Sequence, residues 1–543
     1  MNCKYITWFL FSAGILLLTA CADFLQEQPK DRLPDTGTFN DMQELYLNGV
    51  ASLYNYMGGY SDSQGLQGTG RGVYDLNTFT TDEAMMPTRG GDWFDGGFWQ
   101  GLYLHKWGTD NDAIRATWEY LYKVVGLANL SLAKMDAFQQ AHPDADLAAY
   151  RAEVRALRAL FYYHLMDLFG RMPLVLSPAP STKEIVQQPR SKSYAFIVDE
   201  LLSALPLLPE VPSNRHGSYY GRITRPVVFF LLAKLALNAE IYSDDDWTDK
   251  TRPEGKAIYF NWGGKQLNAW EATIAWCDSL TAMGYTLSDD YAENFAVFNE
   301  NSSENIFVIP MNKYLYTNQM IYLFRSRHYN HAAAYGLGGE NGACATLETL
   351  HTFGYGTAEA DPRFDYCFYA DTVYDLSGRP VRLDNGETLV YYPDKVALDV
   401  TDTPYEKNAG ARMKKYAVDK TATKDGKLME NDIVLFRYAD VLLMKSEALV
   451  RNGQNGDTEL NRVRERVKAP HRTATLQHIL DERLLELVWE GWRRQDLVRF
   501  GLFTRAYSYR PPLEKEANGY TTVFPIPEKI RSLNKNLLQN PGY

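Results

Sequence analysis

Cysteine is scarce in this chain of 543 residues, and basic residues are fewer than acidic ones. Of five cysteines, only Cys277, Cys344 and Cys367 lie far from the N-terminus, so the body of the protein can form at most one disulfide. The fold therefore does not depend on a cystine framework. Lys and Arg number 56 against 67 Asp and Glu, which gives a net charge of −11 and leaves no electrostatic reason to bind nucleic acid.

Catalytic motifs are also missing. The chain has no H-E-x-x-H, no P-loop, no G-x-S-x-G elbow and no paired-cysteine zinc spacing. His328 and His331 are spaced suitably for a metal, but no third ligand accompanies them, and the acidic run 244–246 is expected to be a solvated turn. We therefore predict no metal and no cofactor. The 67 acidic residues leave open a pair of carboxylates placed for glycoside hydrolysis.

One long apolar run is present, at the N-terminus. Residues 5–20 carry no charge, follow Lys4 and end in Leu18-Thr19-Ala20 directly before Cys21. A membrane-spanning helix needs about 20 apolar residues, so this shorter run predicts an export signal, 1–20, that is removed ahead of a lipidated Cys21. The alternative is an uncleaved anchor helix. Either reading predicts an exported protein that is tethered to a membrane.

Helical periodicity dominates the rest of the chain. Apolar residues recur at three- and four-residue steps in 41–57, 111–138, 147–169, 193–205, 224–242 and 269–283, and again in 433–451, 459–467 and 476–500. Between 294 and 431 the pattern changes to loops with a few short strands, including a hairpin signal at Asp384-Asn385-Gly386. We predict a single body, 21–543, that is helical at 41–290 and 432–500 around this irregular insert.

Several ordered motifs lie in the C-terminal half. Residues 432–448 read DIVLFRYADVLLMKSEA, 461–464 read NRVR, 482–501 read ERLLELVWEGWRRQDLVRFG, 524–527 read FPIP and 539–543 read QNPGY. Cys21 with Asp23-Phe24-Leu25, and the segments 81–83 (TDE) and 221–224 (GRIT), add landmarks in the N-terminal half. In this order the motifs resemble those of the SusD/RagB family, the surface nutrient-binding lipoproteins of Bacteroidetes.

This resemblance implies a mainly α fold, an α-α superhelix of tetratricopeptide-like helix pairs with a loop-rich irregular region. It also implies that the protein lies on the outer membrane, faces the cell exterior and has no enzymatic activity. Such a protein captures oligosaccharide or polysaccharide and delivers it to a SusC-like TonB-dependent transporter. A RagB-like peptide-capturing lipoprotein, a glycoside hydrolase and a scaffold for the transporter are the alternatives.

The carboxylates of segment 476–500 have a structural interpretation. Glu482, Glu486 and Glu490 recur at four-residue spacing, near Arg483, Arg493 and Arg494. We expect them to form an ion-pair network that fixes helix packing.

Ligand capture is expected to depend on exposed rings, because sugar C–H faces stack on aromatic surfaces while hydroxyls take hydrogen bonds from nearby polar groups. The glycine-rich segment 90–100 carries several large rings, and glycines there discourage a helix and favour display. Asp92, Asp95, Gln100 and Asn111 are candidate hydroxyl partners. Our candidate ligand-binding residues are Trp93, Phe94, Trp99, Trp107, Trp262, Tyr316 and Tyr329, whereas Trp118, Trp270, Trp276 and Trp489 are expected in the core.

Overall fold

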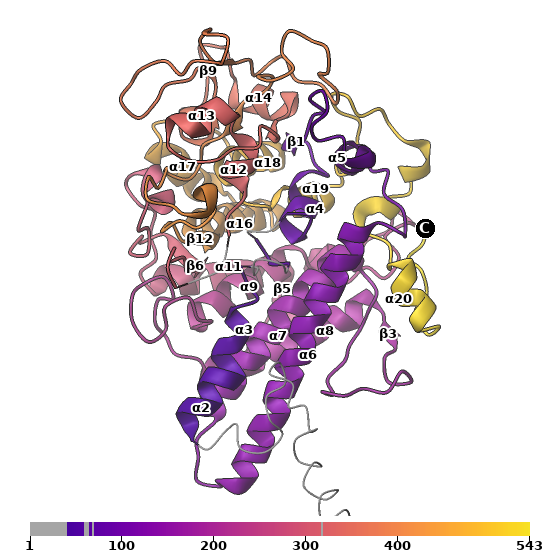
Figure 1. Cartoon of the computed structure of the whole chain (residues 1–543). Helices are drawn as coiled ribbons and strands as arrows, with labels where there is room; N and C mark the ends of the chain where they lie inside the picture. The colour runs from indigo at the N-terminus through magenta and orange to yellow at the C-terminus, as the bar shows by residue number, and fades with distance from the viewer. Residues whose placement is uncertain (1–40, 59–63, 68–69, 316–318) are drawn as a thin grey trace, which may run out of the picture.

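The computed structural model describes residues 41–543 except 59–63, 68–69 and 316–318 (Figure 1). The predicted signal segment and Cys21 lie outside the described residues. Within the described part, no helix has both the length and the apolar character needed to cross a membrane.

Long helices form the first half of the protein. Their bounds lie within a few residues of the predicted ranges, and the first predicted helix contains a π-helical turn, Leu47–Ala51. Asn111 begins the longest helix by accepting hydrogen bonds from the backbone N–H groups of Ala113 and Ile114. The α-helices within the predicted ranges are α2 (Met42–Tyr46), α3 (Ser52–Tyr54), α6 (Asp112–Ala141), α7 (Ala148–Phe169), α8 (Arg190–Ala204), α9 (Arg225–Leu237), α10 (Ala239–Tyr242) and α11 (Ala269–Ala282).

Successive helices pack on one another and build the scaffold. Helix α6 packs on α7, α7 on α8, α8 on α9 and α9 on α11, and α11 then packs on the C-terminal helix α16 (Tyr438–Arg451). Every residue of α9 after Arg225 is buried, so this helix lies at the centre of the stack. Two further helices, α17 (Asp457–Arg466) and α18 (Leu476–Leu487), continue it. The predicted mainly α fold of tetratricopeptide-like helix pairs is confirmed.

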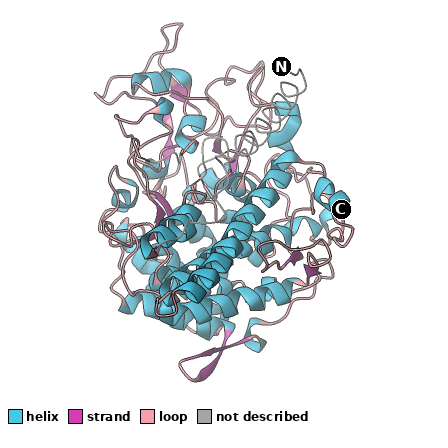
Figure 2. Cartoon of the chain, turned by 60° about the horizontal axis from the view of Figure 1, so that its bottom comes forward, coloured by secondary structure: helices cyan, strands magenta, loops and turns pink. Residues whose placement is uncertain are grey.

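The insert between 294 and 431 is irregular, as predicted, and forms a layer that gathers in the upper part of Figure 1. Figure 2 shows how short its strands are beside the helices. The predicted hairpin is present: Leu383 donates its backbone N–H to Glu387 O. Two strand pairs, β1 (Ala84–Met85) with β7 (Cys344–Ala345) and β12 (Ile433–Arg437) with β6 (Asn305–Ile309), join the insert to the rest of the body.

Four short α-helices and further strand pairs complete the described part of the insert. The helices are α12 (Tyr322–Ser326), α13 (Tyr329–Ala334), α14 (Leu347–Phe353) and α15 (Phe364–Cys367). Strand β8 (Phe368–Tyr369) pairs with β11 (Arg412–Met413), and β9 (Asp371–Thr372) pairs with β10 (Val390–Tyr391).

Two helical predictions at the C-terminal end were wrong. The range 433–451 begins with strand β12, whose five residues are all buried, and a short apolar run of this kind cannot be told from a helix by periodicity. The range 476–500 is interrupted after α18, because Trp489 and Gly491 have φ values of 67° and 76°, in the left-handed region that ends a helix. A second helix, α19 (Arg493–Arg499), follows the break.

The carboxylates of segment 476–500 do form a buried ion-pair network, but the predicted arginine partners were wrong. Arg483 pairs with Asp440 and Asp496, Arg493 with Asp82 and Arg494 with Asp167.

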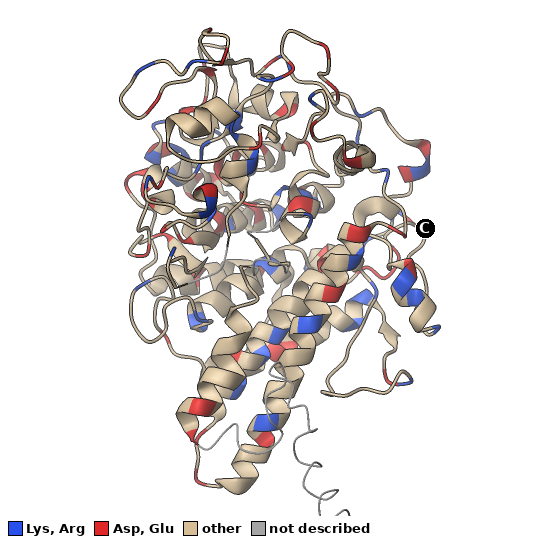
Figure 3. Cartoon of the chain, viewed as in Figure 1, with Lys and Arg blue, Asp and Glu red and all other residues tan. Residues whose placement is uncertain are grey.

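The Arg437 guanidinium lies 2.8 Å from Glu304 Oε1, 2.5 Å from Glu486 Oε1 and 2.8 Å from Glu490 Oε1. Glu486 also pairs with Arg363, at 2.8 Å, and with Arg466. Arg437 ends β12, Glu304 directly precedes β6 and Arg363 precedes α15, whereas Arg466 ends α17, Glu486 is in α18 and Glu490 follows it. The network therefore joins the irregular layer to the helical stack. Elsewhere, charges of both signs are interspersed along the long helices (Figure 3).

One buried carboxyl makes the free energy of unfolding depend on pH. Burial raises the pKa of Asp432 from 3.8 to about 7, although its carboxylate accepts hydrogen bonds from Met311 N, at 2.8 Å, and from Tyr220. The unfolded chain releases this proton near pH 4 and the folded chain keeps it until about pH 7. Stability from this group is therefore lost as the pH rises from about 4 to 7, by up to about 4 kcal/mol.

We predict that Asp432→Asn flattens the pH dependence of stability in that window, because Asn carries no charge to bury. Denaturant unfolding at pH 4.5, 6 and 8 compares the variant with the unmodified protein. Asp144, which is exposed in the turn after α6, supplies a matched control as Asp144→Asn. Parallel pH curves for Asp432→Asn and the unmodified protein would contradict the prediction.

Candidate ligand-binding pocket

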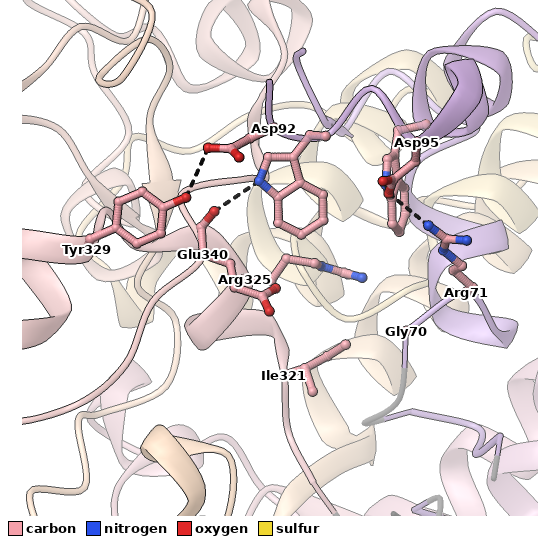
Figure 4. A pocket seen from close by; sticks show the side chains of 10 residues that line it. Gly70, Arg71, Asp92, Asp95, Ile321, Arg325, Tyr329 and Glu340 are labelled. Atoms are coloured by element: carbon pink, nitrogen blue, oxygen red, sulfur yellow. Dashed lines mark hydrogen bonds and ion pairs between the residues drawn. The ribbon is translucent and has the colours of Figure 1, made fainter. Parts of the chain in front are cut away.

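A cavity of about 490 Å³ lies where the glycine-rich segment meets the insert (Figure 4). Arg71 and Asp95 come from the N-terminal half, and Tyr329 and Glu340 come from the insert, with Arg325 between them. Small-molecule sites have volumes of about 300–1,000 Å³, so this cavity is large enough for a ligand. Its lining residues are Gly70, Arg71, Asp92, Trp93, Asp95, Trp99, Ile321, Arg325, Tyr329 and Glu340.

Trp93 is the half-buried ring of the pocket. A tight turn precedes it, in which Arg89 and Asp92 exchange backbone hydrogen bonds of 3.0 and 3.2 Å, and Trp93 itself has φ 63°. Its indole N–H donates to Glu340 O at 2.9 Å. A Cβ placed on Gly342 would come within 2.6 Å of the indole, so this glycine lets the ring lie against the backbone. Trp93 is thus held in one orientation without a ligand.

Trp99 forms the base beneath Trp93. It lies on α5 (Phe98–Tyr103), is 3% exposed, and meets Trp93 edge-to-face with ring centroids 5.9 Å apart. Its indole N–H donates to Asp95 Oδ2 at 2.8 Å, and Arg71 donates to the same oxygen at 2.7 Å. Asp95 therefore links the buried Trp99 ring to Arg71 at the edge of the pocket.

A buried arginine backs the pocket from the insert. Arg325, on α12, makes two hydrogen bonds with the Asp75 carboxylate, of 2.9 and 2.7 Å, and Asp75 belongs to α4 (Val73–Thr78). The guanidinium carbon of Arg325 lies 5.2 Å from the Trp99 ring centroid. This ion pair joins the two halves of the pocket across 250 residues of sequence.

The rim carries groups suited to hydroxyl ligands. Tyr329 donates its hydroxyl to Asp92 Oδ2 at 3.1 Å, and burial together with this carboxylate raises the pKa of Tyr329. Burial also raises the pKa of Glu340. Carboxylate oxygens accept hydrogen bonds from hydroxyls, and an indole face packs on apolar C–H groups. The pocket therefore offers a flat ring flanked by hydrogen-bond acceptors.

The structure brings three of the predicted residues together, since Trp93, Trp99 and Tyr329 all line the pocket. Phe94, next to Trp93, is 58% exposed but lies outside the lining set. Asp92 and Asp95, expected as hydroxyl partners, are also in the lining. The glycine-rich segment therefore displays Trp93 and Phe94 as predicted. Display was wrong for Trp99, because residues 98–100 begin helix α5 and its ring is 3% exposed.

Other candidates lie elsewhere. Trp107 is 8% exposed, donates its indole N–H to the Tyr543 hydroxyl at 2.7 Å and packs on Phe524, so its ring belongs to the core rather than to a display surface. Trp262, on β4 (Tyr259–Trp262), packs edge-on against Phe229 and Trp276 outside the pocket lining. Tyr316 lies outside the described residues.

Two expected hydroxyl partners have structural roles instead. Gln100 donates its side-chain amide to Met86 O and Trp93 O, which holds the turn, and Asn111 caps α6. His328 and His331 are buried, and burial lowers the pKa of His331 to about 2. In the described part of the chain, no group of three or more His, Cys, Asp or Glu residues is placed to hold a metal ion.

Sequence reasoning missed Arg71, Ile321, Arg325 and Glu340. Each is an ordinary residue in its local sequence. Arg325 and Glu340 meet the N-terminal half only through contacts between distant segments, such as the Arg325 pair with Asp75. A local pattern contains no signal for contacts of this kind.

The fold is that of the SusD-like class of proteins. A laminarin-binding SusD-like protein superposes with a TM-score of 0.65 at 22% identity, over 93% of this chain and 100% of that one. Surface glycan-binding protein A of Bacteroides thetaiotaomicron, solved in complex with laminarihexaose, has a TM-score of 0.69 at 20% identity, over 92% of this chain and 100% of that one.

The sequence comparisons agree with the fold. The SusD family model matches residues 279–543, and a second model, described as starch-binding and associating with the outer membrane, matches residues 23–237. This chain belongs to the SusD/RagB family. It is 25% identical to the starch-binding protein SusD of Bacteroides thetaiotaomicron over the whole of both chains, and 25% identical to SusD-like protein P2 of Formosa agariphila over 80% of this chain and 82% of that protein.

Proposed function

We propose that this protein captures oligosaccharides or polysaccharides at the bacterial surface and delivers them to a SusC-like TonB-dependent transporter in the outer membrane. The observation that carries the proposal is the pocket in which Trp93, Asp92 and Tyr329 present a ring, a carboxylate and a hydroxyl together. The names of its relatives support it, since SusD is described as starch-binding and a structural neighbour was solved with laminarihexaose.

Binding in this pocket combines stacking with a few hydrogen bonds. A sugar ring lies against the Trp93 indole, and its hydroxyls donate to carboxylates such as Asp92 and Asp95. A single short saccharide binds modestly, because its lost freedom offsets much of the contact energy. A polymer binds more strongly, since several sites engage one chain at high effective concentration.

The test is affinity electrophoresis through gels that contain one polysaccharide each, from a panel that includes starch and laminarin. Slower migration in at least one gel than in a plain gel is the expected result. A peptide-capturing protein would migrate normally throughout the panel and bind a peptide library instead. An enzyme would release reducing ends from the polysaccharide that slows its migration. Glu340→Gln would abolish that release, because Glu340 is a pocket carboxyl whose pKa is raised.

Gly342→Ala is expected to weaken polysaccharide binding several-fold by moving the Trp93 ring. The added methyl would lie 2.6 Å from the indole and 2.6 Å from Met86 Sδ, closer than atoms pack. Dissociation constants from calorimetry measure the effect. Gly126→Ala, on α6, is the matched control, because nothing lies within 4 Å of its added Cβ. Equal affinities for the two variants would show that the ring position does not govern binding.

Membrane attachment is proposed to depend on Cys21, which becomes the N-terminus of the single body 21–543 after removal of 1–20. Two or more acyl chains on one residue hold a protein stably at a membrane. We predict that Cys21→Ser moves the protein from the outer-membrane fraction to the soluble fraction, as measured by fractionation and immunoblot. Cys3→Ser, within the removed segment, should leave the distribution unchanged. Membrane retention of Cys21→Ser would contradict lipid anchoring at this residue.

Delivery requires contact with the transporter. Tagged protein purified from cell envelopes is expected to co-purify with a TonB-dependent transporter, and no nucleic acid or cofactor takes part in the proposal. Absence of any transporter from the purified complex would argue against delivery while leaving glycan capture in place.

A further inference from the structure

A second and larger groove, of about 710 Å³, lies in the irregular layer and is distinct from the pocket around Trp93. Five tyrosines contribute to its walls: Tyr335, Tyr355, Tyr369, Tyr374 and the buried Tyr416. Asp371 and Asp375 lie among them. The groove therefore combines the two kinds of group that the first pocket offers, aromatic rings and carboxylates.

The rings of this groove are partly accessible. Tyr374 is 51% exposed, while Tyr355 and Tyr369 are half-buried. Tyr355 packs on Phe364 with ring centroids 4.9 Å apart and donates its hydroxyl to Asp371 Oδ1 at 2.9 Å. A ring that is supported on one side by another ring can still present its other side to a ligand.

The groove is held in shape by its own hydrogen bonds. The Asp375 carboxylate accepts from the backbone N–H groups of Ser377 and Arg379, at 2.8 and 2.9 Å, which fixes the turn that follows Tyr374. Tyr335 donates its hydroxyl to Tyr374 O at 3.2 Å. Because these contacts order the walls without a ligand, less freedom is lost on binding.

The groove and the pocket lie at opposite ends of one short helix. Tyr329 begins α13 and lines the pocket, whereas Tyr335 caps the C-terminal end of α13 and lines the groove. Six residues of helix rise by about 9 Å. Along the helix axis, a residue that lines the pocket and a residue that lines the groove are therefore separated by only this rise.

We infer that this groove is a second saccharide subsite, which binds a neutral polysaccharide chain also held at the Trp93 pocket. The ligand class rests on the proposed function. The carboxylates accept sugar hydroxyls and the tyrosine rings stack on sugar faces, as in the pocket. Engagement of both sites raises the affinity for a polymer without changing the affinity for a saccharide too short to span them.

The experiment compares Tyr374→Ala and Tyr355→Ala/Tyr374→Ala with Trp93→Ala in the full chain. Tyr259→Ala is the matched control, since Tyr259 is 56% exposed on β4 and lines neither site. Each variant is tested for retention by the binding polysaccharide and, by calorimetry, for affinity to a trisaccharide of the same linkage. Thermal unfolding shows whether each variant is folded. Should the double variant unfold, Tyr374→Ala, which removes only an exposed ring, still tests whether the groove contributes to polysaccharide binding.

We expect the groove variants to bind the polysaccharide roughly tenfold more weakly and to bind the trisaccharide as the unmodified protein does. If the groove variants bind the polysaccharide as tightly as Tyr259→Ala does, while Trp93→Ala loses binding, the groove is not a saccharide subsite and the proposed function stands. If the groove variants lose polysaccharide binding while Trp93→Ala retains it, the groove binds saccharide and the Trp93 pocket does not. A protein that binds no polysaccharide would overturn both.

Discussion

Trp93→Ala is expected to abolish most binding of polysaccharide. Truncation of a central aromatic contact costs about 2 kcal/mol or more, which corresponds to about a 30-fold weaker dissociation constant. The ring is half-buried and its main hydrogen bond is to Glu340 O at the pocket, so the fold should survive its removal. Retention in a polysaccharide gel and calorimetry measure the loss, and thermal unfolding measures stability.

Trp93→Phe separates the ring from its hydrogen bond. It keeps an aromatic face but cannot donate to Glu340 O, and we expect it to retain more affinity than Trp93→Ala. Tyr259→Ala should bind as the unmodified protein does. If Trp93→Ala were retained as strongly as Tyr259→Ala, stacking on Trp93 would play no part in capture.

Arg437→Met is expected to cause the largest loss of stability. Its guanidinium is buried among Glu304, Glu486 and Glu490, with contacts of 2.5–2.8 Å. Removing the cation leaves these carboxylates buried with too few partners, which typically costs about 3–5 kcal/mol. Denaturant unfolding followed by circular dichroism should show a midpoint at a clearly lower denaturant concentration.

Arg115→Met is the matched control for a surface cation. Arg115 pairs with Asp112 and Glu119 on the exposed side of α6, where an ion pair contributes about 1 kcal/mol or less. Equal midpoints for Arg437→Met and Arg115→Met would mean that the buried network does not fasten the irregular layer to the helices.

The long helices could be predicted because periodicity specifies them. Helix α6 spans 30 residues and begins directly after Asn111, the first residue of the predicted range, although the cap that Asn111 forms was not predicted. Strand β12 could not be predicted, since its apolar residues bury both faces and its partner β6 lies more than 120 residues earlier. The break at Trp489 was missed because a non-glycine residue rarely adopts a positive φ.

Half of the site could be predicted from local sequence. Glycines around Trp93 signalled a turn that displays large side chains, and the turn is present. The same reasoning failed for Trp107, because the contacts that bury it come from Phe524 and Tyr543, more than 400 residues away. Arg325 and Glu340 reach the pocket through tertiary contacts alone.

The central claim is that the Trp93 pocket binds saccharide. A crystal structure with an oligosaccharide from the polysaccharide that the protein binds tests it most directly. The account predicts a sugar ring against the Trp93 indole, with hydroxyls hydrogen-bonded to carboxylates of the same pocket, such as Asp92 or Asp95. An oligosaccharide bound elsewhere on the protein, with this pocket empty, would contradict it.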